Sequence, residues 1–323
     1  MTKIYPKIYP EIYHLKNLQV IEISGADSFK FLQGLITNDV NKILNEEIIY
    51  TAMLNSNGRF LYDFFLCFNQ HNQSIILICS QKYHHDLIKK LNFFRLKSAV
   101  KISPAVNINV LYAPKKNELE NELEKFKGNY QIFKDPRNQA MGFFCLVDHQ
   151  DISKLAIDDN LFAYHCTRIN NLICQGEFDL ISEKSFIQEF AFDKINAIDY
   201  NKGCYVGQEI IARSYHRGEI RKRIINLEID LLENNIFKQK LFNLVNNQDL
   251  LTKNPNYYFF DCQNSLKISN CNQEIGQLLS LIFDEKKCLA LGQIKISENL
   301  KLENLNNDLI IEQINISSAK INF

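Results

Sequence analysis

The chain has 323 residues, a length at which about two domains are expected and no disulfide or metal is needed to complete the core. Apolar residues make up 46% and charged residues 23%, which excludes a largely disordered protein. The 37 basic and 37 acidic side chains cancel, so the sequence lacks the basic excess that direct nucleic-acid binding requires.

No apolar run approaches the ~18 residues that span a bilayer, and the first residues lack the pattern of a signal or transit peptide. We therefore expect a cytoplasmic protein that binds no membrane. The nine cysteines are odd in number, which favours free thiols over a disulfide framework. None forms a Cys-x-x-Cys pair, and no closely spaced Cys and His set predicts a metal site.

The first two thirds of the chain predict an α+β fold. Residues 18–24 alternate between apolar and polar as a half-buried strand does, and residues 24–27 resemble the capping box of a helix that follows. Further helices are predicted at residues 83–94, 119–126 and 161–173, and further strands at residues 60–68 and 74–79. Strands and helices do not alternate regularly enough for a doubly wound sheet.

From about residue 222 the pattern changes to short strands separated by polar stretches rich in Asn, Asp, Lys and Glu. These strands are predicted at residues 224–231, 257–261, 277–283, 288–296 and 309–316. We therefore predict an α+β region over residues 1–222 and an all-β domain, a small barrel, over residues 223–323.

The densest run of special residues lies at residues 202–213. Glycines flank Cys204 on both sides, and residues 208–213 predict a helix, which places this cysteine in the turn before a helix N-terminus. Exposed N–H groups there, together with Lys202, favour a thiolate, which can attack an electrophile, pass on a labile group or bind metal. Free cysteines are more often small buried hydrophobes, and that interpretation is kept for the other eight. For Cys204, composition alone leaves both interpretations open.

Residues 202–209, Lys-Gly-Cys-Tyr-Val-Gly-Gln-Glu, are similar to the defining octapeptide of the YgfZ family of folate-binding proteins, relatives of the glycine-cleavage T-protein. Four more blocks resemble the same family, at residues 24–39, 54–63, 94–98 and, more weakly, 276–280. The continuation over residues 212–223 most resembles the mitochondrial and α-proteobacterial branch, which serves iron–sulfur assembly.

The resemblance implies a three-lobed ring of two interleaved α+β lobes and a C-terminal β-barrel around a folate-sized channel. It implies a monomeric accessory factor for the maturation or repair of 4Fe–4S proteins, which indirectly supports tRNA methylthiolation. The implied partners are iron–sulfur assembly proteins or client 4Fe–4S enzymes, and the implied ligand is tetrahydrofolate or a derivative. Lys202 and Cys204 would line the channel with Cys204 as the functional thiol, and Asp63 is a third catalytic candidate. The residues expected to bind the folate are Tyr205, Gly207, Gln208, Glu209, Arg168 and Arg213.

Two departures from the related T-protein bear on its reaction. The carboxylate pair after the glycine-rich block of the T-protein reads Tyr62 and Asp63 here, which leaves one carboxylate. The Arg-x-Glu segment reads Arg168-Ile169-Asn170, which replaces a charged acceptor for the pterin by a weaker neutral amide. Both departures disfavour the second hypothesis, a tetrahydrofolate-dependent aminomethyltransferase of the glycine-cleavage type. A third hypothesis, a folate-binding module without chemistry, requires Cys204 to be dispensable.

Three groups keep two interpretations each. Asp63 is either a channel carboxylate or a surface residue at a strand end, and Arg168 pairs either with a folate carboxylate or with Glu177. The basic residues between 213 and 223 form either a solvated face or a docking surface for an acidic partner or the glutamate tail of a folate.

Overall fold

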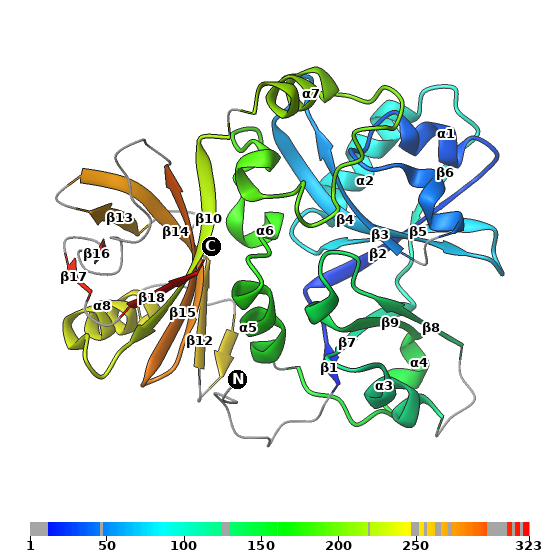
Figure 1. Ribbon diagram of the computed structural model, residues 1–323. Helices are drawn as coiled ribbons and strands as arrows, with labels where there is room; N and C mark the ends of the chain where they lie inside the picture. The colour runs from blue at the N-terminus through cyan, green and yellow to red at the C-terminus, as the bar shows by residue number, and fades with distance from the viewer. Residues whose placement is uncertain are drawn as a thin grey trace. The chain divides into compact units, whose positions relative to one another are not determined.

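The computed structural model describes residues 12–45, 48–124, 129–159, 161–218, 220–246, 252–254, 257–261, 266–270, 273–295, 309–311, 314–316 and 319–322. The chain forms two compact units, and each is discontinuous in sequence. The first unit comprises Met1–Phe29, Asn41–Ile49 and Phe64–Tyr164, and the second comprises Lys30–Val40, Tyr50–Asp63 and His165–Phe323. The colours of Figure 1 follow the chain through both units.

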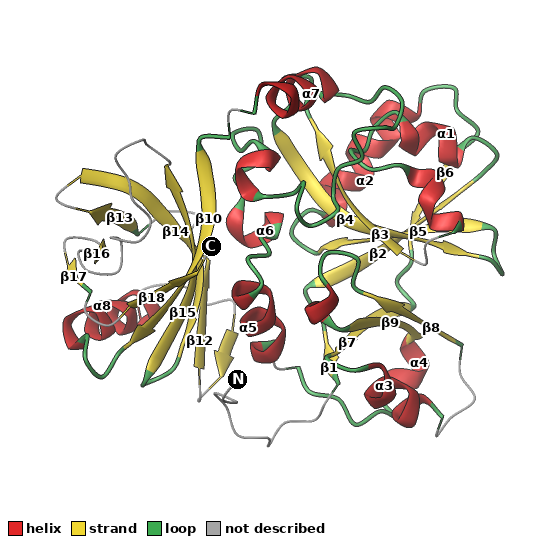
Figure 2. Cartoon of the chain, in the orientation of Figure 1, coloured by secondary structure: helices red, strands yellow, loops and turns green. Residues whose placement is uncertain are grey.

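The first unit is built on two antiparallel sheets (Figure 2). One has the order β3-β4-β5-β2-β6, with β3 (Ile48–Leu54), β4 (Phe60–Asn69), β5 (Ser74–Ser80), β2 (Leu18–Ser24) and β6 (Lys101–Pro104). Most of β3 and the first residues of β4 belong to the second unit. The other has the order β1-β7-β9-β8, with β1 (Tyr13–His14), β7 (Ile108–Ala113), β9 (Phe143–Asp148) and β8 (Tyr130–Lys134). The strands predicted at residues 18–24, 60–68 and 74–79 are confirmed as β2, β4 and β5.

Helices cover these sheets where the sequence places apolar residues on one helix face. They are α2 (His84–Arg95), α3 (Lys116–Leu123), the short η2 (Gln139–Met141) and α4 (His149–Ile152). The predicted helix over residues 83–94 is confirmed as α2, which buries Leu87 and Leu91. In α3, Leu119 and Leu123 pack into a core cluster with Leu111 and Val147 of the second sheet, while predicted position 126 lies outside the described residues.

The second unit contains short helices and the large C-terminal sheet. Its part of the chain includes most of α1 (Ser28–Gln33), the start of η1 (Val40–Leu44), most of β3 (Ile48–Leu54), most of α5 (Phe162–Asn170), and α6 (Gly176–Asp179), η3 (Ile187–Phe190) and α7 (Gln208–Arg217). Strand β3 and the start of β4 are neighbours in a sheet and are joined by a tight turn, in which the Asn55 N–H donates to the Arg59 carbonyl at 2.9 Å. The helix predicted at residues 161–173 is confirmed as α5.

The C-terminal sheet has nine described strands, and every described pairing in it is antiparallel. Its main path is β17-β16-β13-β14-β15-β10-β18, and β12 pairs with both β14 and β11. The strands are β10 (Lys222–Asp230), β11 (Thr252–Asn254), β12 (Tyr257–Asp261), β13 (Lys267–Asn270), β14 (Gln273–Phe283), β15 (Lys287–Lys295), β16 (Leu309–Ile311), β17 (Ile314–Asn315) and β18 (Ala319–Asn322). The run predicted as one strand at residues 309–316 is two short strands.

The expectation of an all-β C-terminal region is wrong in one element. Residues Asn235–Asn246 form the helix α8, which Figure 2 shows beside the strands of this sheet. Phe237 and Leu241, one helical turn apart, are buried in the core that the sheet encloses. The asparagines around them have low helix propensity and hid this spacing. The predicted boundary after residue 222 coincides with the start of β10, but the two compact units do not divide there, and the boundary stays a prediction.

A buried polar network ties α5 to α6 and to the C-terminal sheet. The Arg168 guanidinium is fully buried and forms an ion pair with Asp179, Nη1 to Oδ2, at 2.8 Å. Its Nη2 donates to Ser280 Oγ of β14 at 2.8 Å, and its Nε donates to His165 Nδ1 at 3.1 Å. The His165 ring stacks on Phe259 of β12 with centroids 3.8 Å apart. One arginine thus connects the neighbouring helices α5 and α6 to two strands, β12 and β14, that are distant in sequence.

This network predicts a specific acid sensitivity. Burial and the Arg168 cation lower the pKa of His165 well below 6.5, so the ring is neutral in the folded protein. In the unfolded chain it takes up a proton at about pH 6.5, so its contribution to stability is complete above that pH and is lost as the pH falls below it. We expect this residue to steepen the fall in unfolding free energy below about pH 6.5 by up to ~1.4 kcal/mol per pH unit.

Urea unfolding at a series of pH values checks this expectation. His165→Asn keeps a hydrogen-bond acceptor for Arg168 and removes the titration, so the variant should lack the added slope even where it is less stable at neutral pH. Equal slopes in the wild type and the variant would contradict the prediction.

Candidate functional site

Three of the sequence blocks singled out above meet in the second unit. The Val206 N–H donates to the carbonyl of Gly34 at 3.1 Å, which joins the octapeptide to the segment after α1. Gly207 has a φ of +83°, and a Cβ there would lie 2.6 Å from the Asn55 carbonyl oxygen of the β3–β4 turn. Gly58, at a φ of +69°, approaches Ile210 of α7 in the same way. Glycine is required at both positions because no side chain fits and the backbone is left-handed.

Lys202 holds the segment that follows α1. Its Nζ donates to the backbone carbonyls of Gln33, Ile36 and Asn38 at 2.8, 2.6 and 2.8 Å. An ammonium has three N–H donors, so all of them are used by these carbonyls. Burial lowers the pKa of Lys202 to about 8, against the opposing effect of Asp39 and Asp199. The geometry gives Lys202 a structural role and leaves it no N–H for a substrate.

Cys204 is an accessible thiol. The predicted helix after it is confirmed as α7, and at the neighbouring Gly203 an added Cβ would meet no atom within 4 Å. Of the seven cysteines in the described part of the chain, six are buried and Cys204 is exposed. Cys262 and Cys271 lie outside the described residues.

Burial makes most of the other cysteines unreactive. It raises the pKa of the thiols of Cys67, Cys145, Cys166, Cys174 and Cys288, that of Cys145 to about 12. A thiol with so high a pKa stays protonated at neutral pH and is a poor nucleophile or metal ligand. The interpretation of these five as buried hydrophobes agrees with their positions, and Cys204 is the exposed thiol among the described cysteines.

The remaining octapeptide residues shape the start of α7. The Tyr205 N–H donates to Gln208 Oε1 at 3.2 Å, and burial raises the pKa of the Tyr205 phenol. Glu209 and Arg213 form an ion pair of 2.7 Å on the exposed side of the helix. Of the residues expected to bind a folate, Tyr205, Gly207, Gln208, Glu209 and Arg213 therefore lie together on this loop and helix.

Asp63 and Arg168 are enclosed by protein. The Asp63 carboxylate accepts hydrogen bonds from the Tyr50 hydroxyl and from the Gly176 N–H, the latter at 2.7 Å. A Cβ at Gly176 would lie 2.4 Å from this carboxylate, so the start of α6 is packed directly against it. Asp63 is neither a surface residue nor open to a ligand, because it is only 5% exposed. Arg168 forms a structural ion pair, with Asp179 in place of the Glu177 considered above.

Two residues of the site had no role in the sequence analysis. Asn38 donates from Nδ2 to the carbonyls of Tyr50 and Asn196 at 2.9 and 2.8 Å, and Thr37 donates from Oγ1 to the Ala197 carbonyl at 2.7 Å. Both side chains are buried, and they tie the segment after α1 to β3 and to residues 196–197. Their signal in the sequence is a Thr-Asn pair in the turn after α1, where backbone groups without partners in the helix need polar side chains.

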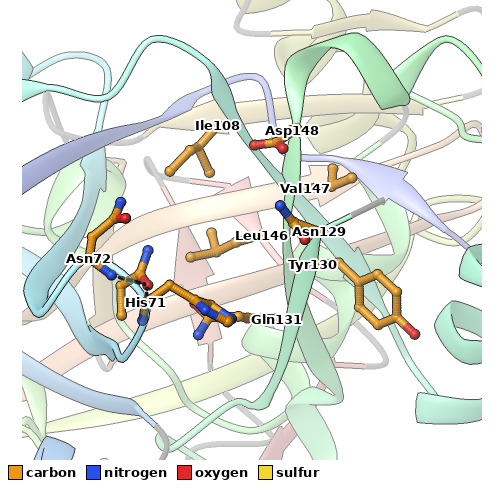
Figure 3. A pocket seen from close by; sticks show the side chains of 10 residues that line it. His71, Asn72, Ile108, Asn129, Tyr130, Gln131, Leu146, Val147 and Asp148 are labelled. Atoms are coloured by element: carbon orange, nitrogen blue, oxygen red, sulfur yellow. Dashed lines mark hydrogen bonds between the residues drawn. The ribbon is translucent and has the colours of Figure 1, made fainter. Parts of the chain in front are cut away.

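Pockets occur beside α7 and in the first unit. One, of about 350 Å³, lies beside α7 and is lined by Phe186, Gln188, Glu189, Ile210, Arg213, Ser214, Ile220 and Arg221. The other, of about 270 Å³, lies in the first unit, and Figure 3 shows the amides of Asn72, Asn129 and Gln131 on its walls. In the described part of the chain, no three His, Cys, Asp or Glu side chains are grouped so that they could hold a metal ion. The described helices include none that is long and apolar enough to cross a membrane.

The comparisons identify the fold of the chain. Residues 11–109 match the GCVT N-terminal domain. The glycine cleavage system aminomethyltransferase T of Bartonella henselae has the same fold, with a TM-score of 0.65 over 96% of this chain and 83% of that one, at 12% identity. The chain therefore has a T-protein-like fold, with the predicted α+β architecture and a C-terminal barrel-like sheet.

Within this class the chain is related to a particular group. It is 31% identical to the mitochondrial iron–sulfur cluster assembly factor IBA57 homologue of Neurospora crassa, over 65% of this chain and 52% of that protein. The homologue of Dictyostelium discoideum is 28% identical over 69% and 63%, and IBA57 of Mus musculus is 27% identical over 68% and 66%. The resemblance to the iron–sulfur assembly branch is thus confirmed, although the chain spans only about half the length of the Neurospora relative.

The exposure of Cys204 predicts selective labelling. Native protein treated with a small excess of N-ethylmaleimide should be modified at Cys204 before the six buried cysteines, because a buried thiol is shielded and protonated. Peptide mass spectrometry after timed quenching measures the order of modification, and Cys204→Ala is the control. Equal labelling of Cys204 and Cys145 would contradict the structure.

The contacts of Lys202 predict a loss of stability on substitution. Lys202→Met leaves three backbone carbonyls without their donor and should lower the unfolding free energy by about 2–3 kcal/mol. Lys202→Arg should not restore it, because a planar guanidinium cannot direct three N–H groups at one convergent set of carbonyls. Urea unfolding measures both, with Lys194→Met, which removes an exposed lysine, as the control. The prediction fails if Lys202→Met and Lys194→Met are equally stable.

Proposed function

We propose that this chain is an accessory factor for the maturation or repair of 4Fe–4S proteins, with the Cys204 thiol as the acting group. One observation carries the proposal: the single exposed cysteine among those described stands on a loop fixed by Lys202, Val206 and Gly207. The description of the relatives as iron–sulfur cluster assembly factors supports it.

The proposed action of Cys204 is transient ligation of the cluster, which is cargo for this protein. A thiolate is the usual protein ligand of cluster iron, and a 4Fe–4S cluster usually has four such ligands. One exposed cysteine supplies one ligand, so the others come from the protein that delivers or receives the cluster. The space around Gly203 allows such a partner to approach the loop backbone closely.

The proposed partners are therefore iron–sulfur assembly proteins or client 4Fe–4S enzymes. Support of tRNA methylthiolation follows indirectly if a client is the cluster enzyme of that modification. The exposed basic side chains just before and at the start of β10, Arg221 and Arg223, suit an acidic partner surface. We propose the cytoplasm as the compartment of this chain, whereas the relatives are named as mitochondrial proteins.

A tetrahydrofolate-type ligand is proposed from the resemblance, but two of the residues assigned to the site do not fit it. The side chains of Asp63 and Arg168 are buried, and both form hydrogen bonds to other groups of the protein. Any folate would be held by the loop and first turns of α7, through Tyr205, Gln208 and Arg213. We assign the folate no step in the mechanism.

The aminomethyltransferase hypothesis has less support from this geometry. Transfer of a one-carbon unit to tetrahydrofolate needs a carboxylate that can meet the ligand, and the corresponding Asp63 is occupied by Tyr50 and Gly176. The likeness to the Bartonella aminomethyltransferase, at 12% identity, concerns the fold.

The proposal is tested in a strain that lacks its own member of this family. Wild type and Cys204→Ala are expressed separately, with Ala212→Ser on the exposed side of α7 as a matched control. Wild type and Ala212→Ser should restore the activity of a 4Fe–4S enzyme. Cys204→Ala should leave it at the level of the empty vector, because the other described thiols are buried and cannot replace the ligand.

Immunoblots must show equal soluble levels of the three proteins. Rescue by Cys204→Ala would retain the pathway and remove the thiol from its mechanism. No rescue by any of the three, at equal levels, would contradict the proposed function.

A further inference from the structure

The C-terminal end of α2 presents apolar side chains to solvent. The helix buries Leu87 and Leu91, yet Phe93 is 73% exposed and Leu96, directly after the helix, is 87% exposed. The rings of Phe93 and Phe94 lie edge to face with centroids 5.4 Å apart. We call Phe93, Phe94 and Leu96 the α2 tip. Such residues expose apolar surface to water at a cost, so their exposure requires an explanation.

The backbone of the α2 tip is held in a conformation that side chains rarely adopt. Leu96 has a φ of +44°, which is strained for a residue with a Cβ. The chain just beyond it is fixed, because Asp27 Oδ2 accepts a hydrogen bond from the Ala99 N–H at 2.7 Å. Gly25, at a φ of +118°, approaches the Ala99 carbonyl so closely that a Cβ would lie 2.1 Å from its oxygen. The turn therefore holds Leu96 outward and is prevented from relaxing.

These contacts join two of the sequence blocks, residues 24–29 and residues 94–98 with the residue that follows them. Residues 24–29 supply the glycine and the aspartate that brace the turn, and residues 94–98 are the turn itself. A strained and braced turn that exposes a leucine is what a preformed anchor requires, since an anchor side chain binds best when its position is fixed beforehand.

Helix α2 and the residues on either side of it are rich in basic side chains. Residues 82–101 contain six basic side chains (Lys82, Lys89, Lys90, Arg95, Lys97 and Lys101) and one acidic side chain, Asp86, in a chain whose net charge is zero. Lys82, Lys89, Lys97 and Lys101 are exposed. Two carboxylates lie near these six basic side chains: Asp86, 3.5 Å from Lys89, and Asp27, which accepts a hydrogen bond from the Ala99 N–H. The positive charge around the tip is thus largely uncompensated.

We propose that the α2 tip is a docking surface for the apo form of a client 4Fe–4S protein, through a pocket surrounded by acidic side chains; this rests on the proposed function. A maturation factor must contact the protein that it loads, and apolar anchors within a charged ring are the usual arrangement of such contacts. Phe93 and Leu96 fill the pocket, and the lysines accelerate the encounter and select acidic surfaces. An anionic membrane would need no braced turn and would gain little from two anchor residues.

The experiment measures binding of the chain to a purified acidic apo-enzyme, the same 4Fe–4S enzyme that is assayed in the complementing strain. Phe93→Ser combined with Leu96→Gly removes both anchors, and glycine relieves the strained φ, so the variant should unfold at a urea concentration no lower than that of the wild type. Leu232→Ser combined with Ile236→Ser is the control, because these side chains are 63% and 69% exposed beside α8.

We expect the dissociation constant, measured by biolayer interferometry, to rise at least about tenfold in the α2-tip variant and to stay unchanged in the control. Lys89→Glu combined with Lys97→Glu should slow association and weaken its dependence on salt. Rescue of the enzyme in the strain by the α2-tip variant should fall in parallel with binding.

Three outcomes would overturn the docking proposal: unchanged binding of the α2-tip variant, an equal loss in the control, and no binding of wild type to the apo-enzyme. Binding of wild type to vesicles of anionic lipid, lost in the α2-tip variant while apo-enzyme binding is retained, would assign the surface to a membrane and also overturn it. Failure of rescue by wild type with apo-enzyme binding intact and dependent on the α2 tip would contradict the proposed function alone.

Discussion

The convergence of three backbone carbonyls on the Lys202 ammonium is the interaction on which the candidate site depends. The last carbonyls of a helix and of the turn after it have no partners within the helix. Gln33 is the last residue of α1, and Ile36 and Asn38 lie in the turn that follows. Lysine brings three donors to one point and offsets the cost of its own burial by satisfying all of them. The same contact ends α1 and fixes the loop that carries Cys204. The order of the Cys204 loop and the order of the segment after α1 therefore depend on the same side chain.

The described cysteines differ in burial, and no motif in the sequence marks this difference. A thiol inside a sheet or helix core, such as Cys67 or Cys288, has a raised pKa and behaves as a small apolar side chain. Cys204 differs because the left-handed glycine at 207 and the clamp at Lys202 hold its loop at the surface. Among the seven described cysteines, six thiols are buried and the thiol of Cys204 alone is exposed.

Local patterns in the sequence predicted local structure, and contacts between distant residues limited the rest. The alternation at residues 18–24 and the glycine–cysteine run before α7 need only neighbouring residues, and both are confirmed. The ion pair of Arg168 with Asp179 and its bond to Ser280 depend on folding over long separations. The acceptors of Lys202 are backbone carbonyls, which every residue type carries, so no sequence pattern indicates them. In α8, the spacing of Phe237 and Leu241 was present but was masked by poor helix formers.

The surroundings of Asp63 show that the same residue type at the same place in a fold can serve the structure alone. Its position on β4 is one where a T-protein-like sequence carries a carboxylate, and the residue is still an aspartate here. The neighbouring position is Tyr62, and the Asp63 carboxylate receives hydrogen bonds from Tyr50 and from the first N–H of α6. A carboxylate with these partners stabilises the backbone that packs on it, and freeing it for a ligand would leave a buried donor unpaired. Retention of the aspartate is therefore no sign that a ligand meets this carboxylate, because its hydrogen bonds hold the backbone of α6. The exposed thiol of Cys204 lies on another loop of the same unit.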